Sequence, residues 1–243
     1  MFINLAAYRF VDLDRLPERR QALDERGRPL GLKGTVLLAP EGINLSVSGP
    51  ERAVREWAAQ LGADPAFAGL DCKEGRSPQV AFKRWRVRIR EEIVTFRQLG
   101  IRPHDRRAPA VSPATLARWL DAGRDDDGRP VVLVDTRNRF EVQAGSFDSA
   151  VDLELASFTD LPAAVAARQD QWRGQRVVTF CTGGIRCEKA ALFMQQQGVE
   201  HVVQLDCGVL RYFDRVGAAH WRGELFVFDD RVGIAPAVDR IAA

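Results

Sequence analysis

The sequence predicts two domains, an α+β sandwich followed by an α/β domain with a parallel sheet. The length of 243 residues suits one or two domains. In the first part of the chain, strand and helix signals follow the order β-α-β-β-α-β, which fits a ferredoxin-like sandwich. In the second part, short apolar strands alternate with helices, and this order implies a parallel sheet covered on both faces.

The first domain is predicted over residues 1–99. Strands are expected where apolar residues alternate or cluster, and helices where apolar residues recur at helical spacing. Pro17 falls in the first turn of one helix, and Gly49-Pro50 opens the other. The expected elements are a strand at 3–11, a helix at 14–26, strands at 34–38 and 43–47, a helix at 51–61, and a long strand or strand pair at 82–96.

The second domain is predicted over residues 113–234, after a linker at 100–112 and before a C-terminal tail at 235–243. The linker is polar and combines Pro103, Pro109 and a cluster of charges. The strands that follow are short and apolar, which is typical of strands buried in parallel sheets. The expected elements are a helix at 113–122, a strand at 131–134, a helix at 161–172, a strand at 176–180, a helix at 187–197 and a strand at 202–205.

Composition and charge exclude several classes of protein. Hydrophobic residues make up 46% and charged residues 28%, which excludes a mostly disordered chain. Four cysteines are too few for a disulfide scaffold, no apolar run is long enough for a membrane span, and no secretory signal is evident, so a cytoplasmic location is expected. Residues 1–107 carry 20 Lys or Arg and 14 Asp or Glu, against 15 and 19 in the remainder. This asymmetry indicates two units with different partners.

The segment that says most about function begins at Cys181. Cys181 ends a predicted parallel strand and a helix follows its loop, so it lies at the edge where open α/β sheets bind ligands. The loop amides, the helix N-terminus and Arg186 all favour the thiolate, which is the nucleophilic form of cysteine. We therefore predict Cys181 as the catalytic nucleophile, with an anion-binding loop of Thr182, Gly183, Gly184, Ile185 and Arg186.

Other interpretations of this loop fit the sequence less well. A phosphate-binding P-loop needs Gly-Lys-Ser/Thr, which is absent. A cysteine phosphatase places arginine six positions after its cysteine, whereas Arg186 lies five positions after Cys181 and the sixth position is Cys187. Cys181 as a small core residue at a strand end is the remaining alternative.

The other cysteines carry weaker signals. Cys187 is a candidate resolving thiol, and the alternative is a buried cysteine on the helix. Cys207 is either a third redox thiol on the same rim or a small loop residue, and Cys72 is expected to be structural. Asp135 and Arg137 are expected to form a buried ion pair, with Glu141 also part of the scaffold.

A basic strand in the first domain indicates contact with nucleic acid. Strict alternation places Arg84, Arg86, Arg88 and Arg90 on one face and Lys83, Trp85, Val87 and Ile89 on the other. Four guanidinium groups at about 3.3 Å per residue extend over roughly 20 Å, which matches a row of RNA phosphates. The candidate RNA-binding residues are Lys83, Arg84, Arg86, Arg88 and Arg90. The alternative is a solvated sheet face paired with Glu91 and Glu92.

Several distinctive segments occur in one chain. CTGGIRCEKA (181–190) resembles a rhodanese active-site loop, and VDTRNRFEV (134–142) resembles the Asp-x-Arg…Glu signature of the same domain. Together with GLKGTVLLAPEGIN (31–44), KRWRVRIREEIVT (83–95) and WRGELFVFDDRV (221–232), they resemble the rhodanese-related tRNA uridine hydroxylase family. The chain departs from that family at Cys207-Gly208, where Gly-Gly is common, and in lacking the Cys-rich C-terminal tail of longer members.

The resemblance implies a ferredoxin-like domain joined to a rhodanese domain. It also implies oxygen-dependent hydroxylation of the wobble uridine, position 34, of tRNA to 5-hydroxyuridine. The family's active cysteine, described as forming a persulfide, matches Cys181. The expected partner is therefore the anticodon region of tRNA, with molecular oxygen as co-substrate and without DNA or a membrane. No nucleotide-cofactor motif occurs, and the three histidines lack metal-ligand spacing, so no cofactor or metal is predicted.

Two other functions stay open. A plain sulfurtransferase would pass persulfide sulfur from Cys181 to a thiol or to cyanide. An inactive rhodanese module would serve RNA binding or signalling without catalysis. The basic first domain favours the hydroxylase over simple sulfur transfer, and the intact cysteine loop argues against the inactive module.

Overall fold

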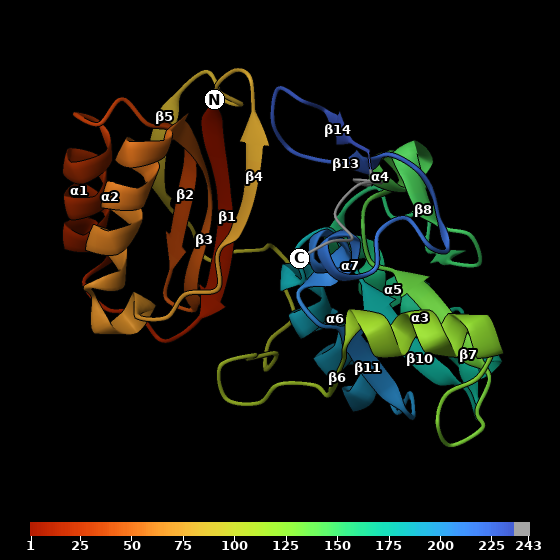
Figure 1. Cartoon of the computed structure of the whole chain (residues 1–243). Helices are drawn as coiled ribbons and strands as arrows, with labels where there is room; N and C mark the ends of the chain where they lie inside the picture. The colour runs from red at the N-terminus through yellow and green to blue at the C-terminus, as the bar shows by residue number, and fades with distance from the viewer. Residues whose placement is uncertain (236–243) are drawn as a thin grey trace. The chain divides into compact units, whose positions relative to one another are not determined.

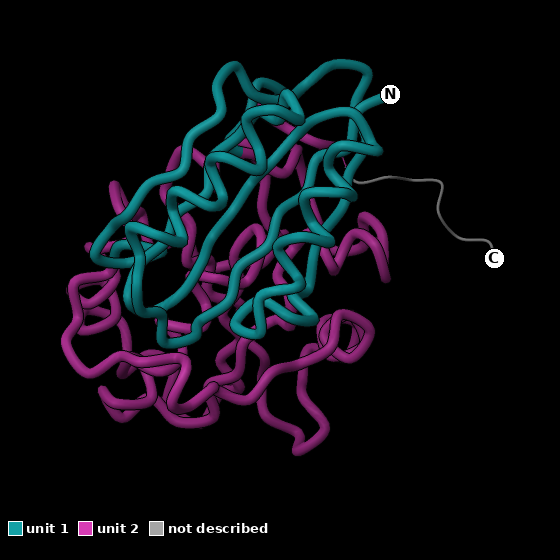
Figure 2. Tube along the Cα trace, turned by 90° about the vertical axis from the view of Figure 1, so that its left-hand side faces the viewer, with its two compact units in different colours: residues 1–95, 228–231 teal, residues 96–227, 232–243 magenta. Residues whose placement is uncertain are grey.

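The computed structural model describes residues 1–235 and divides them into two compact units. The first unit comprises Met1–Thr95 together with Phe228–Arg231, and the second comprises Phe96–Val227 with 232–235 (Figure 2). The predicted tail at 235–243 lies, except for its first residue, outside the described residues. Each unit has its own sheet and its own core.

The first unit contains a five-stranded sheet with two helices on one face (Figure 1). In sheet order the strands are β4 (Lys73–Ser77), β1 (Phe2–Phe10), β3 (Gly42–Pro50), β2 (Lys33–Ala39) and β5 (Trp85–Ile89). The first four are antiparallel, whereas β5 pairs with β2 in parallel. The predicted α+β sandwich is therefore confirmed, with β5 as an added edge strand.

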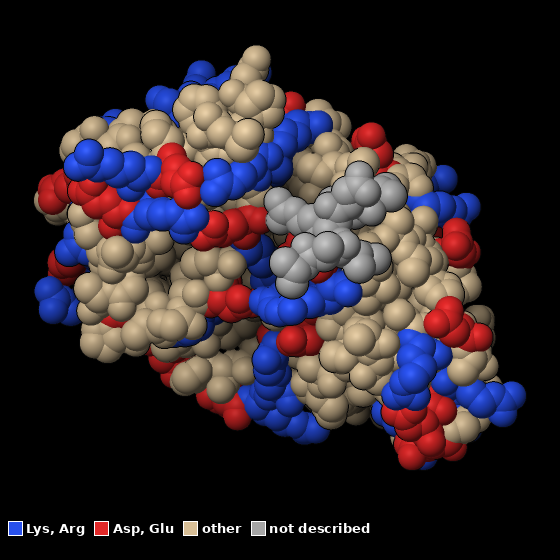
Figure 3. Space-filling model, viewed as in Figure 1, with Lys and Arg blue, Asp and Glu red and all other residues tan. Residues whose placement is uncertain are grey.

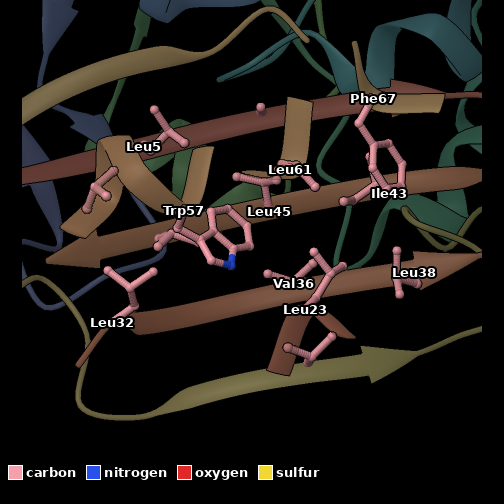
Figure 4. Packing of buried hydrophobic residues seen from close by; sticks show 14 of the residues in the cluster. Leu5, Leu23, Leu32, Val36, Leu38, Ile43, Leu45, Trp57, Leu61 and Phe67 are labelled. Carbon is pink, nitrogen blue, oxygen red and sulfur yellow. The ribbon is translucent and has the colours of Figure 1, made fainter. Parts of the chain in front are cut away.

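The helices α1 (Leu16–Gly27) and α2 (Glu51–Gly62) cover the apolar face of this sheet. In α2, Val54, Trp57 and Leu61 are buried at helical spacing and pack on the alternate inward residues of the strands (Figure 4). Trp57 meets Trp85 edge to face at 5.6 Å between ring centroids, which ties β5 to the core. Basic side chains that alternate with these inward residues on β5 therefore lie on the opposite face.

The prediction of a long strand or strand pair at 82–96 is wrong, since only Trp85–Ile89 is a strand. Beyond it the chain leaves the sheet edge and bonds to the β2–β3 hairpin. The amide of Ile93 donates to Glu41 at 2.8 Å, and its carbonyl accepts from Asn44 at 3.0 Å. Strand β4 was not predicted, because its sequence KEGRS has no alternation of apolar residues and its pairing with β1 decides its conformation.

The second unit contains a parallel sheet with helices on both faces. In sheet order its strands are β6 (Ala110–Val111), β11 (Val202–Leu205), β10 (Arg176–Phe180), β7 (Val131–Asp135) and β9 (Val151–Asp152). The helices α3 (Pro113–Ala122) and α7 (Gly208–Arg215) pack on one face, with inward side chains such as Val203 and Leu205. Gln204 points to the other face and bonds to α6 (Ile185–Gln196). The predicted α/β domain is confirmed, and β6 lies within the predicted linker.

The predicted helix at 161–172 is two shorter elements, α5 (Leu161–Ala166) and the 3₁₀ helix η3 (Gln169–Trp172). Several other elements are too short to give a periodic signal. They are η1 (Pro65–Phe67), α4 (Arg139–Ala144), β8 (Gly145–Phe147), η2 (Phe158–Asp160), β12 (Trp221–Gly223), β13 (Leu225–Phe226) and β14 (Gly233–Ile234).

None of the helices within residues 1–235 is long and apolar enough to cross a bilayer. On the side of the molecule drawn in Figure 3, basic and acidic side chains lie interspersed.

Candidate active site

Cys181 is the first residue after β10, and α6 begins four residues later (Figure 1). This position at the carboxyl end of a parallel strand is the one that the sequence predicts. Gly184 precedes the helix with φ of +98°, a conformation that favours glycine and lets the loop turn back over the sulfur. The strand, the loop and the helix therefore place the loop amides around Cys181.

The loop amides point at the sulfur. The amide of Gly184 donates to Cys181 Sγ at 3.2 Å, and the amides of Arg186 and Cys187 also lower the pKa of this thiol. Cys181 has no exposed surface, so a substrate atom can contact the sulfur only after neighbouring atoms move aside. The loop thus forms a nest for a negative charge in a dry environment.

The interaction between Cys181 and Cys187 shifts the pKa values of the two thiols in opposite directions. Burial alone raises the pKa of Cys181, but the hydrogen bond from Cys187, the charge of Arg186 and the two loop amides bring it down from 9.0 to about 6. Burial and the interaction with Cys181 raise the pKa of Cys187 well above 9.0, although Thr136, at 3.7 Å from its sulfur, opposes this. At neutral pH the pair therefore consists of a Cys181 thiolate and a Cys187 thiol that donates to it.

Arg186 is a fixed charge rather than an open anion-binding group. Its guanidinium forms two bonds to the Glu141 carboxylate, at 2.6 and 2.7 Å, and both side chains are buried. Glu141 also accepts the amide of Asn138 at 3.1 Å, which anchors the carboxylate to the start of α4. The guanidinium lowers the pKa of Cys181 from this fixed position.

A second ion pair holds the end of the neighbouring strand. Arg137 Nη2 lies 2.6 Å from the carboxylate of Asp135, and neither side chain has exposed surface. Arg137 also donates to the carbonyl of Gly145 at 2.7 Å, and Ser146 donates to Asp135 at 2.8 Å. The predicted buried pair is confirmed, and it joins the end of β7 to β8.

The start of α7 packs directly against the cysteine loop. In this first turn the amide of Val209 donates to the carbonyl of Cys181 and the amide of Leu210 donates to the carbonyl of Thr182, each at 3.0 Å. Gly208 has φ of +71°, and a Cβ atom there would lie 2.5 Å from the carbonyl oxygen of Cys181. Only glycine therefore allows this approach, a requirement that the sequence pattern did not reveal.

Two further side chains lie beside this loop. Cys207 comes directly before Gly208 and is partly exposed, so it lies on the same rim as Cys181, and its redox role stays a prediction. The hydroxyl oxygen of Thr182 is buried and has no hydrogen-bond partner among the described residues. A buried hydroxyl without a partner can bond to a ligand or a water molecule that reaches it.

The candidate RNA-binding residues Lys83, Arg84, Arg86, Arg88 and Arg90 form what we call the basic row. The strand that carries its central members has the alternation of exposed and buried residues that the sequence predicts. Val87 is buried between the exposed Arg86 and Arg88, and Trp85 and Ile89 at the two ends of the strand are partly buried. Lys83, Arg84 and Arg90 are also exposed, and within the described chain no ion pair joins Arg84, Arg86 or Arg88 to an acidic side chain. Lys33 of β2 lies on the same face, because Gly34 pairs with Trp85, and the sequence analysis missed it.

The chain is similar to known proteins along nearly its whole length. Residues 2–93 match the UPF0176 acylphosphatase-like domain, and residues 112–214 match the rhodanese-like domain. A protein of Cupriavidus taiwanensis named tRNA uridine(34) hydroxylase is 52% identical over 98% of this chain and 84% of its own length. One of Bordetella petrii with the same name is 53% identical over 97% of this chain and 94% of its own. Among solved structures, a human single-domain sulfurtransferase is 23% identical and covers 44% of this chain and 97% of its own, with a TM-score of 0.36.

Replacing the Cys187 thiol should raise the pKa of Cys181. In Cys187→Ala the donated hydrogen bond is lost, so the pH midpoint for alkylation of Cys181 should move up from about 6. The measurement is the rate of iodoacetamide labelling against pH, resolved by peptide mass spectrometry. Cys72→Ala is the matched control and should leave the midpoint unchanged. An unchanged midpoint in Cys187→Ala would show that this hydrogen bond does not stabilise the thiolate.

Removing Glu141 should destabilise the second unit, because it leaves the buried charge of Arg186 without a partner. Glu141→Ala is expected to lower the free energy of unfolding by about 3–5 kcal/mol, measured by urea denaturation. Glu74→Ala, which breaks an exposed pair with Arg55, should leave the stability nearly unchanged. Equal stability losses in the two variants would contradict this account of the ion pair.

Proposed function

The chain belongs to the tRNA uridine(34) hydroxylase family, and we propose that it hydroxylates uridine 34 of tRNA to 5-hydroxyuridine with molecular oxygen as co-substrate. The observation that carries the proposal is the Cys181 thiolate, held by loop amides and Arg186 at the end of β10. An ionised, desolvated sulfur is the group in this site that can attack an electrophilic carbon. The rhodanese-like domain carries the reactive group, and the exposed basic residues of the first unit support the proposal that this unit binds RNA.

The nucleophile acts on C6 of the uracil ring. When the sulfur of Cys181 adds to C6, the S–C6 bond forms and the electron pair of the C5=C6 bond moves towards O4 as an enolate. C5 then becomes electron-rich and bonds to one oxygen atom of O2, while the other oxygen atom leaves as water with two electrons from an external reductant. Loss of the C5 proton restores the C5=C6 bond and breaks the S–C6 bond, whose electron pair returns to the Cys181 sulfur. Thr182 follows Cys181 in the loop, and its buried hydroxyl, which has no partner among the described residues, can donate to an oxygen of the base.

The Cys187 thiol has a second role in the proposal. A persulfide on Cys181 is an alternative form of the nucleophile. The Cys187 thiol interacts by a hydrogen bond with the Cys181 sulfur, which is the inner sulfur of such a persulfide. After losing its proton, the Cys187 sulfur can therefore bond to the Cys181 sulfur of such a persulfide, or of a sulfenate. The disulfide forms as the outer S–S or S–O bond breaks, and hydrosulfide or hydroxide leaves with the electron pair of that bond. Cys187 is thus both the hydrogen-bond donor that stabilises the thiolate and the candidate resolving thiol.

The substrate is a single-stranded base in the anticodon region. Such bases unstack at low cost and can be turned into a protein site. Lys83, Arg84, Arg86, Arg88 and Arg90 supply exposed positive charge for the phosphates of the same RNA. An RNA substrate of this kind also favours a cytoplasmic location.

Sulfur transfer is the second candidate function, because residues 112–214 match a rhodanese-like domain and the Cys181 loop can carry a persulfide. That function leaves the exposed basic row of the first unit unused. Deleting the first unit would impair hydroxylation but would spare transfer of sulfur from thiosulfate to cyanide. The two activities can therefore be separated by assay.

Loss of the Cys181 sulfur should abolish the modification. Cells that carry Cys181→Ser in place of the wild-type chain should lack 5-hydroxyuridine in total tRNA, as measured by nucleoside mass spectrometry, because oxygen at this position is not ionised at neutral pH. Cys72→Ala should retain the modification. Full hydroxylation by Cys181→Ser would rule out attack by this residue.

Neutralising the basic row should weaken RNA binding in a salt-dependent way. Arg86→Ala and Arg88→Ala should each lower the slope of log affinity against log salt by about 1, because each removes one phosphate contact. Arg55→Ala, an exposed arginine already paired with Glu51, is the control and should keep the slope. If the salt dependence of RNA affinity were unchanged in Arg86→Ala and Arg88→Ala, the RNA phosphates would not bind at these two arginines.

A further inference from the structure

Helix α4 has one face in the active site and another at the surface. Glu141 points inward and binds Arg186, whereas Arg139 and Phe140 are exposed. The backbone amide of Arg139 donates to the carbonyl of Leu155 at 2.8 Å, so the start of the helix is anchored. Neighbouring residues of one short helix therefore join the Cys181 site to a surface that the chemistry described so far does not use.

Phe140 is an aromatic side chain that is held in place and yet accessible. Its ring packs edge to face on Phe226 of β13, with centroids 5.1 Å apart and an interplanar angle of 83°. At the same time 46% of the residue is exposed. An exposed ring that is already ordered loses little conformational freedom when a flat ligand stacks on it.

Arg139 supplies a charge one residue before Phe140 on the same helix. It is exposed, and within residues 1–235 it forms no ion pair with an acidic side chain. Aromatic rings that stack with bases and arginines that bind phosphates are the combination by which proteins hold single-stranded RNA. The charge and the ring on α4 are complementary to a nucleotide whose base is unstacked.

We propose that Arg139 and Phe140 form a contact surface for a nucleotide of the substrate RNA, with its base on the Phe140 ring and its phosphate at Arg139. This inference rests on the proposed function for the identity of the RNA. The surface lies one residue from Glu141, which is bonded to Arg186 in the cysteine loop. A nucleotide bound there holds the RNA next to the loop that carries the nucleophile.

The test measures RNA binding without turnover. The probe is an anticodon stem-loop RNA with uridine at the wobble position, and its affinity for the full chain is measured by fluorescence anisotropy. Phe140→Leu keeps the apolar bulk but loses the ring, and it should bind about five- to one-hundred-fold more weakly. Phe140→Trp should bind as the wild type does, and Arg139→Ala should lower the salt slope by about 1.

Leu99→Ala is the matched control, since Leu99 is a fully exposed apolar residue of the same unit. It should bind the probe as the wild type does. The alkylation midpoint of Cys181 should stay near 6 in Phe140→Leu, which shows that the site itself is intact. The proposal would be overturned if Phe140→Leu bound the probe with wild-type affinity. It would also be overturned if the substitution changed self-association of the protein and left its affinity for RNA unchanged.

Binding and turnover separate this inference from the proposed function. Binding by the wild type and by Phe140→Leu is measured without oxygen, so that no hydroxylation occurs during the titration. If the wild type forms no 5-hydroxyuridine but its RNA affinity depends on Phe140, the proposed function fails and the contact surface stands. If hydroxylation occurs and Phe140→Leu leaves affinity unchanged, the contact surface fails alone.

Discussion

The second unit is organised around one buried negative charge, the thiolate of Cys181. A thiolate without exposed surface is unfavourable unless hydrogen bonds and a positive charge compensate it. The Gly184 amide, the Cys187 thiol and the Arg186 guanidinium provide that compensation. Their combined effect outweighs burial, which alone would keep the sulfur protonated and unreactive.

Each compensating group is itself fixed by another part of the chain. Glu141 of α4 holds Arg186, and the first turn of α7 approaches so closely that only Gly208 fits beside the Cys181 carbonyl. The Asp135–Arg137 pair fixes the end of the adjacent strand. The loops after three neighbouring parallel strands, β7, β10 and β11, therefore converge on one sulfur, and this geometry preorganises the nucleophile before substrate binds.

Local signals predicted much of this arrangement. The helix at 113–122 and the strands at 176–180 and 202–205 match their elements, because strong periodicity or β-branched residues coincide there with tertiary packing. Interactions between distant residues were not predictable from local pattern. Arg186 was expected to bind an anion or to stabilise the thiolate, but its bond to Glu141, 45 residues away, was not predicted. The polar strand β4 and the early end of β5 likewise depend on pairing partners elsewhere in the sheet.

The most direct test of the thiolate's role is the pH dependence of hydroxylation in a single turnover with saturating RNA. Because the thiolate is the reactive form, activity should be low below the pKa of Cys181 and rise as pH increases through about 6. The rise should follow the fraction of ionised sulfur, read from absorbance of the thiolate in the same samples. A rate that stays constant between about pH 5 and pH 8, while that fraction changes, would contradict the account.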